Sequence, residues 1–409
     1  MLIFQTRPNK FPTRGRKPKL FAERTNWNLE PNRLSRALAA RRASGKPILD
    51  LTLSNPTECG FRYAEHPIRT ALCSPEILHY RPDPKGISSA RAAVAKYYSE
   101  LGAAADLEAI FLTVSTSESY SFAFRLLCNP GDELLVPAPS YPLFDFLAEI
   151  HDVKLIRYPL LYENGWRVNF HALEKSLTAR TRAVIVVHPN NPTGHYTKSG
   201  ELAQLNHICA ARELALIADE VFLDFALREE TPHSFAANST ALTLTASGIS
   251  KICGLPQMKA AWLAISGPQA AKTQAIARLE VLADTYLSLN TPVQLALPTF
   301  LDGRFELQRQ LISRVKRNLA ELDAQVAAQR GCVRLTVEGG WYAVLQIASI
   351  TEEEEFATGL LQDSGVYVHP GHFFEFASPG YLVLSLITPE KEFSTAVQLL
   401  LARANEQRR

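Results

Sequence analysis

The chain has 409 residues, of which 46% are hydrophobic and 21% are charged, a composition typical of a globular enzyme long enough for two domains. Its 43 lysines and arginines nearly balance its 41 aspartates and glutamates, so its net charge excludes a global attraction to nucleic acid or to a membrane surface. No stretch of about 18 apolar residues occurs, so no membrane-spanning helix is expected.

The N-terminus and the cysteines indicate the cellular compartment of the protein. Residues 1–24 form a basic extension without the apolar core of a secretory signal, and we expect it to be solvated or to clasp a partner rather than to bind nucleic acid. The six cysteines are scattered and include no Cys-x-x-Cys pair, which argues against a disulfide framework or a zinc site. These features predict a soluble cytoplasmic enzyme.

The first predicted elements after the extension are short. Leu34 and Leu38 lie on one face of a predicted helix at 32–43, and a strand follows at 47–51. A second helix is predicted at 91–101, after the turn at Gly86.

From about residue 110, short apolar runs alternate with helical patterns. Such a rhythm predicts a mostly parallel sheet covered by helices. The strands are predicted at 110–114, 133–136, 153–158, 183–187 and 214–218, and the helices at 117–127, 141–150, 170–177 and 202–213.

The C-terminal part has a different pattern, with long helices first and strands later. We predict a compact α+β unit here, and we expect a large domain at 66–295 and a smaller one that combines 25–65 with 296–409. The predicted helices lie at 269–282, 307–330 and 355–361, and the predicted strands at 334–337, 341–345 and 381–386.

Three polar residues follow apolar runs in an informative order. Asn191 lies in a turn between two predicted strands, Asp219 ends the next strand, and Lys251 follows the apolar run at 242–244. Open α/β sheets bind ligands at the carboxyl ends of their strands. A lysine there can form an imine with a carbonyl, a carboxylate can pair with a pyridinium, and an amide can donate to a ring oxygen. The trio predicts a pyridoxal-phosphate (PLP) site; an exposed lysine, a helix cap and a plain turn are the alternatives.

PLP also needs a phosphate cradle and an aromatic cover. Ser115, Thr116 and Ser117 follow a predicted strand and open a helix, so they form either an anion site or a simple cap. Lys259 can add a cation to the same phosphate. Tyr141 can stack on the ring, with ordinary core packing as its alternative.

These segments resemble the class I/II aminotransferases of the fold-type I PLP-dependent enzymes, from about residue 25 to 400. The matching motifs are YRPDPKG at 80–86, NPGDE at 129–133, HPNNPTG at 188–194, DEVF at 219–222, SGISK at 247–251 and NTPVQLALP at 290–298. The resemblance implies an α/β fold with a large PLP-binding domain, and a homodimer with the active site at the subunit interface. It also implies that Tyr80 reaches the phosphate of the partner subunit.

The sequence departs from the family pattern at four positions. Val383 stands where the family usually has an arginine that grips the substrate carboxylate, and Phe222 replaces the tyrosine that bonds the ring oxygen. Lys259 replaces the phosphate-binding arginine, and Gly248 replaces a serine. The substrate is therefore either an amine without a carboxylate at the reacting carbon or an amino acid held elsewhere, with Asn55, Arg62, Arg81, His369 and His372 as candidates.

The sequence thus predicts an aminotransferase that moves an amino group from an amino donor to a 2-oxo acid. Lys251 and Asp219 are the predicted catalytic residues, with no metal, nucleic acid or membrane partner. A lyase, decarboxylase or racemase that uses the same cofactor is the alternative. A non-catalytic PLP-binding regulator is a third interpretation, which the short segment before the resemblance disfavours, because a DNA-binding domain needs more residues.

Overall fold

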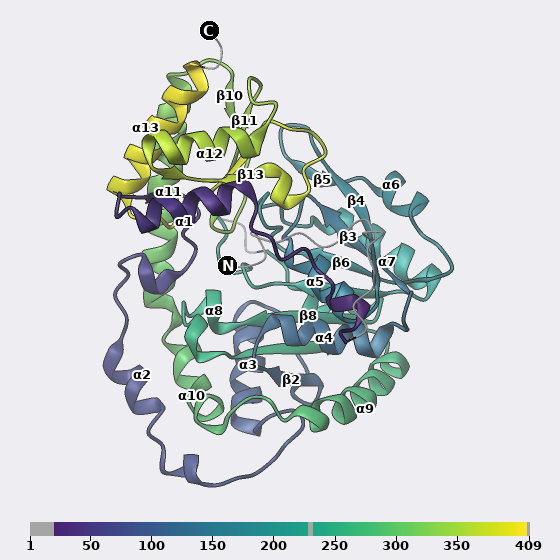
Figure 1. Cartoon of the computed structure of the whole chain (residues 1–409). Coiled ribbons are helices and arrows are strands. Elements are labelled where there is room, and N and C mark those ends of the chain that lie inside the picture. Colours follow the sequence, from purple (N-terminus) through teal and green to yellow (C-terminus); the bar gives the residue numbers. More distant parts are fainter. Residues whose placement is uncertain (1–19, 228–231, 407–409) are drawn as a thin grey trace.

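The structure is a computed structural model that describes residues 20–227 and 232–406 (Figure 1). Most of the predicted basic extension at 1–24 lies outside the described residues. Within the described ranges, no helix combines the length and the apolar composition that a bilayer crossing requires.

An eight-stranded sheet forms the centre of the larger part, in the order β2-β9-β8-β7-β6-β3-β4-β5. Five of its strands, from β8 across to β4, run parallel to one another, whereas β9 and β5 are antiparallel to their neighbours. The strands are β2 (Ile110–Thr113), β3 (Glu133–Ala138), β4 (Lys154–Tyr162), β5 (Trp166–Val168), β6 (Thr181–Val187), β7 (Ala215–Asp219), β8 (Thr243–Gly248) and β9 (Ala261–Ser266). The predicted mostly parallel sheet is confirmed.

Helices cover both faces of this sheet, which is why its central strands are apolar throughout. Ile185 and Ile217 pack into one cluster with α4 (Thr116–Leu127), α5 (Leu143–Ile150) and α9 (Gln269–Tyr286). Val184 and Leu216, one residue away on each strand, pack on the opposite face. That face is covered by α3 (Ser88–Glu100), α6 (Phe170–Lys175), α7 (Ser199–Arg212) and α10 (Thr291–Asp302).

The C-terminal part is built on a four-stranded antiparallel sheet in the order β10-β11-β14-β13. The N-terminal segment joins it, because β1 (Leu49–Asp50) pairs with β12 (Val366–Tyr367) and α1 (Arg33–Ala43) lies beside α12 (Figure 1). The other elements here are β10 (Cys332–Arg334), β11 (Tyr342–Ile347), β13 (His369–Pro370), β14 (Tyr381–Ser385), α11 (Arg304–Ala327), α12 (Glu353–Ser364) and α13 (Glu390–Glu406). A further short helix, α2 (Glu65–Ala71), precedes α3.

Several predicted elements have other bounds than expected, as two of the C-terminal part illustrate. The strand predicted at 334–337 is instead β10, which ends at Arg334, because the chain then leaves the sheet and Gly339 bridges to Ala226. The helix predicted at 307–330 begins and ends three residues earlier, at Arg304 and Ala327. The domain boundaries near 66 and 295 stay a prediction.

Candidate active site

The strand register brings the predicted phosphate and lysine segments to one edge of the large sheet. Thr113 at the end of β2 and Gly248 at the end of β8 both pair with Ala261 at the start of β9. Ser115 follows β2, Lys251 follows β8, and Lys259 precedes β9, so all three segments lie at this edge.

The same edge continues across the parallel strands. Asp219 at the end of β7 pairs with Ala246 of β8 on one side and with Val187 of β6 on the other. The turn with Asn191 follows β6, and Tyr141 follows the next strand, β3. Segments from six neighbouring strands thus converge at one edge, where open α/β sheets bind their ligands.

Lys251 lies in a one-turn helix, α8 (Ile249–Ile252), which directly follows β8. Its Nζ lies 5.1 Å from the ring centroid of Trp341 and 5.7 Å from that of Phe222. Burial among these rings lowers the pKa of Lys251 to about 8, although the field of Asp219 opposes the shift. A substantial fraction of the amine is therefore neutral near physiological pH, as attack on a carbonyl requires.

Asp219 is buried and held through both carboxylate oxygens. The Tyr120 hydroxyl donates to Oδ2 at 2.9 Å, and the backbone N–H of Val221 donates to Oδ1 at 3.1 Å. Burial raises the pKa of Asp219, whereas these two donors and Lys251 lower it. The donors thus favour the ionised form that a pyridinium partner needs.

The turn after β6 contains two asparagines with different surroundings. The Nδ2 of Asn190 donates to the Pro139 carbonyl and to Thr193 Oγ1, which ties the turn together. Asn191 is also buried, and the Oδ1 atoms of both asparagines have no hydrogen-bond partner among the described residues. An unpaired buried amide oxygen costs on the order of 1–3 kcal/mol, so the turn keeps hydrogen-bonding capacity for a ligand or for a water.

The start of α4 serves as a cap and can also bind an anion. Ser115 Oγ accepts from the N–H of Glu118 at 3.2 Å, which confirms the cap geometry. The first backbone N–H groups of the helix, at Thr116 and Ser117, have no acceptor within the helix. They and the helix dipole can bind a phosphate.

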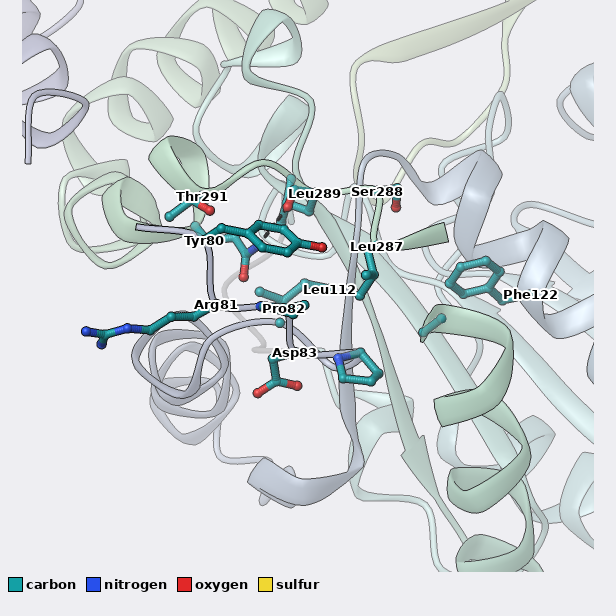
Figure 2. Close-up of a pocket in the computed structure, with 14 residues that line it drawn as sticks. Tyr80, Arg81, Pro82, Asp83, Leu112, Phe122, Leu287, Ser288, Leu289 and Thr291 are labelled. Atoms are coloured by element: carbon teal, nitrogen blue, oxygen red, sulfur yellow. Dashed lines mark hydrogen bonds between the residues drawn. The ribbon is translucent and has the colours of Figure 1, made fainter. Parts of the chain in front are cut away.

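The remaining predicted cofactor residues differ in how close they come to this edge. Tyr141 is half-buried, and burial raises its pKa, with smaller contributions from Tyr342 and Asp219. Lys259 is exposed, with a left-handed backbone at φ 53°. Tyr80 is 78% exposed and lines a surface pocket of about 480 Å³ instead (Figure 2). Lys251 is not among the described residues that line this pocket.

The residues that depart from the family pattern are accommodated by apolar packing. Val383 is buried in β14, where it pairs with Val344 and His369. The Phe222 ring packs edge-on against Trp341 at 5.2 Å and against Tyr342 at 6.1 Å. An aromatic cluster thus lies where the family has a hydroxyl.

The structure places the five candidates for holding a substrate carboxylate in environments that differ from one another. Asn55 caps the short helix Pro56–Glu58, and the backbone N–H of His372 donates to buried Glu353, which the His372 ring also contacts. Burial lowers the pKa of His369 to about 3, so its ring is neutral at physiological pH. Arg62 and Arg81 are exposed.

Gly248 lies too close to β9 to be replaced. A Cβ there would lie 2.8 Å from Ala261 Cβ and 2.9 Å from the Ala260 carbonyl oxygen. We expect Gly248→Ala to lower the free energy of unfolding by about 1–3 kcal/mol, because overpacking strains this part of the sheet. Urea unfolding of Gly200→Ala is the matched control, since a Cβ at Gly200 meets nothing within 4 Å. Equal stability of the Gly248 variant and the wild type would contradict this packing.

Glu220, beside Asp219, gives the fold a pH-dependent stability. It is fully buried, accepts from Ser234 Oγ and from the N–H of Phe235, and has its pKa raised to about 8 by burial. The folded chain therefore binds a proton more tightly than the unfolded chain, and this contribution to stability is lost as the pH rises toward 8. We expect Glu220→Gln to gain stability relative to the wild type between pH 5 and pH 9, as measured by thermal unfolding.

Glu133 provides an opposite control for that experiment. It is also buried, but Thr178 and Arg180 hydrogen-bond to it and lower its pKa. Its contribution is present above the unfolded pKa and is lost as the pH falls, so Glu133→Gln should be least stable, relative to the wild type, at neutral and higher pH. Parallel trends for the two variants would contradict the assignment at Glu220.

Two site residues could not be identified from the sequence. Tyr120 lies on α4, within reach of Asp219, and Trp341 comes from the C-terminal part of the chain. The sequence feature that could have identified Tyr120 is a tyrosine in the helix after the phosphate segment, because a buried tyrosine hydroxyl needs a hydrogen-bond partner. Nothing local marks Trp341, because its contact with Lys251 is formed only by the fold.

Comparison with known proteins agrees with this architecture. The family model "Aminotransferase class I and II" matches residues 69–400. Alanine aminotransferase of Mycobacterium tuberculosis is 28% identical over 370 residues, which cover 88% of this chain and 86% of that protein. Glutamate-pyruvate aminotransferase AlaA of Escherichia coli is 30% identical over 261 residues, 63% of this chain and 64% of that protein. The fold matches an E. coli aminotransferase structure with a TM-score of 0.84 and 24% identity, covering 96% of this chain and 99% of that one.

Enzymes of this family transfer an amino group between an amino acid and a keto acid, and they are generally PLP-dependent. The predicted fold-type I architecture and the predicted family are both confirmed, since the family model spans more than half of the chain. The chain belongs to the class I and II aminotransferases and is an aminotransferase.

Proposed function

We propose that this aminotransferase uses PLP, with Lys251 as the residue that forms an imine with the cofactor aldehyde. The observation that carries the proposal is the placement of Lys251, with a pKa lowered to about 8, beside Asp219 at the carboxyl edge of the sheet. Partial removal of the Lys251 amine from water costs free energy, and a lysine pKa lowered in this way is typical of a functional site.

The residues at this edge fit the parts of PLP. The side-chain Nδ2 of buried Asn191 would donate to the ring oxygen, and the N-terminus of α4 offers Ser115, Thr116 and Ser117 to the phosphate. Exposed Lys259 adds positive charge at the same edge. The absence of a hydroxyl at Phe222 leaves Asn191 as the proposed donor to the ring oxygen.

When bound, PLP supplies an aldehyde for imine formation and a ring that withdraws electrons from the bonds of the substrate α-carbon. Residues of the chain provide the proton transfer, the contact to the pyridine nitrogen and the exclusion of water. With PLP bound, Lys251 would carry the proton to and from the substrate α-carbon, and Asp219 would hold the proton on the pyridine nitrogen. Trp341 and Phe222 exclude water from the Lys251 amine, and Tyr141 covers the ring.

We also propose a cytoplasmic homodimer, in which Tyr80 completes the site of the partner subunit. Tyr80 and Leu78 are 78% and 86% exposed, and Tyr80 lines a pocket together with Leu287 and Leu289 (Figure 2). Exposed apolar patches of this kind mark interaction sites. No nucleic-acid partner is proposed, because the net charge is close to zero.

For the substrates, we propose an amino donor and a 2-oxo acid acceptor. The relatives named alanine aminotransferase and glutamate-pyruvate aminotransferase make alanine, glutamate and pyruvate the first compounds to assay. Buried Val383 motivates a second set of primary amines that have no carboxylate at the reacting carbon.

The test is a spectroscopic assay of the PLP-loaded protein with these donors and acceptors. Conversion of the bound cofactor from its aldehyde form to its amine form by a donor, reversed by a 2-oxo acid, is the expected result. Release of ammonia or CO₂, or racemised product without that conversion, would overturn transamination in favour of lyase, decarboxylase or racemase chemistry.

A further inference from the structure

Tyr120 has an unusual position for a core aromatic residue. Its ring packs edge-on against Phe144 at 5.1 Å, and its hydroxyl donates to Asp219 Oδ2 at 2.9 Å. Among the described residues, it is the only side chain that donates a hydrogen bond to this carboxylate, since the other donor is the backbone N–H of Val221. Both Tyr120 and Asp219 are buried, so water competes little for this hydrogen bond.

The helix that carries Tyr120 also begins at the phosphate segment. Ser115 caps α4, and Tyr120 follows five positions later, which corresponds to about 7.5 Å along a helix axis. One rigid helix therefore sets the separation between an anion bound at its N-terminus and the carboxylate of Asp219.

We infer that Tyr120 is a positioning residue, which orients the Asp219 carboxylate toward the pyridine nitrogen and fixes its distance from the phosphate end of α4. The inference rests on the proposed PLP site, because it assigns Asp219 to that nitrogen. A ring of the same shape without the hydroxyl would keep the packing and lose the orientation.

The charged and titratable groups around Asp219 come from several elements. Lys251 lies on α8, Glu220 follows Asp219 in the chain, and Tyr141 follows β3. Loss of the Tyr120 donor raises the pKa of Asp219 beyond the rise already caused by burial, because a donor to the charged form is removed. A carboxyl that binds its own proton more tightly holds a protonated pyridine less well.

The test compares Tyr120→Phe with Tyr97→Phe in the full-length protein. Tyr97 is a matched control, since its buried hydroxyl donates at 2.7 Å to Asp224, whose side chain is 5% exposed and which is not one of the proposed site residues. Tyr120→Phe should weaken PLP binding about tenfold or more, measured by absorbance titration of the cofactor-free protein, whereas Tyr97→Phe should change it less than about twofold. Equal weakening by both variants, or none by Tyr120→Phe, overturns the inference.

A second readout uses the cofactor-free protein alone. Asp219 has a raised folded pKa, so its contribution to stability falls as the pH rises, and Tyr120→Phe should extend that fall to higher pH. Thermal unfolding of Tyr120→Phe in an Asp219→Asn background should lose this extra pH dependence, and its persistence would overturn the inference. If the wild type itself binds no PLP, the proposed function fails; if it binds PLP but Tyr120→Phe binds equally well, only the inference fails.

Discussion

Replacing Lys251 with alanine is expected to lower kcat/KM for transamination by at least about 10⁴-fold, because one side chain both forms the imine and carries the proton. Burial beside Trp341 and Phe222 lowers the pKa of Lys251 to about 8, so the amine is ready for both roles. Steady-state assays with the donor and acceptor that the spectroscopic test identifies measure this loss.

The control for that experiment is Lys154→Ala, since Lys154 is exposed at the start of β4, away from the carboxyl edge. It should keep the wild-type kcat/KM. A small primary amine added to Lys251→Ala should restore part of the rate, because it can replace the proton carrier. A Lys251→Ala variant that retains activity within about tenfold of the wild type would contradict the assignment.

Replacing Asp219 with asparagine is expected to lower kcat/KM by about 10²–10³-fold while leaving the fold at least as stable as in the wild type. The loss follows because asparagine cannot hold the pyridinium through a charge-assisted hydrogen bond. The preserved stability follows because burial raises the pKa of Asp219, so the ionised form is unfavourable in the folded chain. Kinetics and thermal unfolding at pH 8 measure the two effects.

Asp224→Asn is the matched control, since Asp224 is also buried and also accepts from a tyrosine hydroxyl. It should change kcat/KM much less, because Asp224 hydrogen-bonds to Gln308 and Tyr97 rather than facing the site. Similar losses of activity in both variants would show that the effect at Asp219 is structural.

Much of the sheet could be predicted, because its central strands are apolar runs separated by helical patterns. The position of Asp219 at a strand end followed from that pattern and agrees with the structure. The strand β9 was missed, since its alanine-rich apolar run does not distinguish a strand from a buried helix. In the sequence, Gly248 is recognised only as a departure from the family pattern. The structure gives the reason for a glycine there, because β9 lies so close that a Cβ would clash with it.

The candidate site residues could be predicted where each directly follows a predicted strand in the sequence. Asn191, Asp219 and Lys251 each follow an apolar run, and the register of the parallel strands then brings them to one edge. Contacts that depend on distant segments could not be read from the pattern. Trp341 reaches Lys251 from the C-terminal part, and Tyr80 lines a surface pocket with residues of the segment before α10.

The most direct test is borohydride reduction of the full-length protein in the presence of PLP, followed by peptide mapping. We predict a phosphopyridoxyl group on the peptide that contains Lys251, and none in Lys251→Ala. A label on Lys259 alone, or no specific label at equimolar PLP, would contradict the assignment of Lys251 and with it the account of the site.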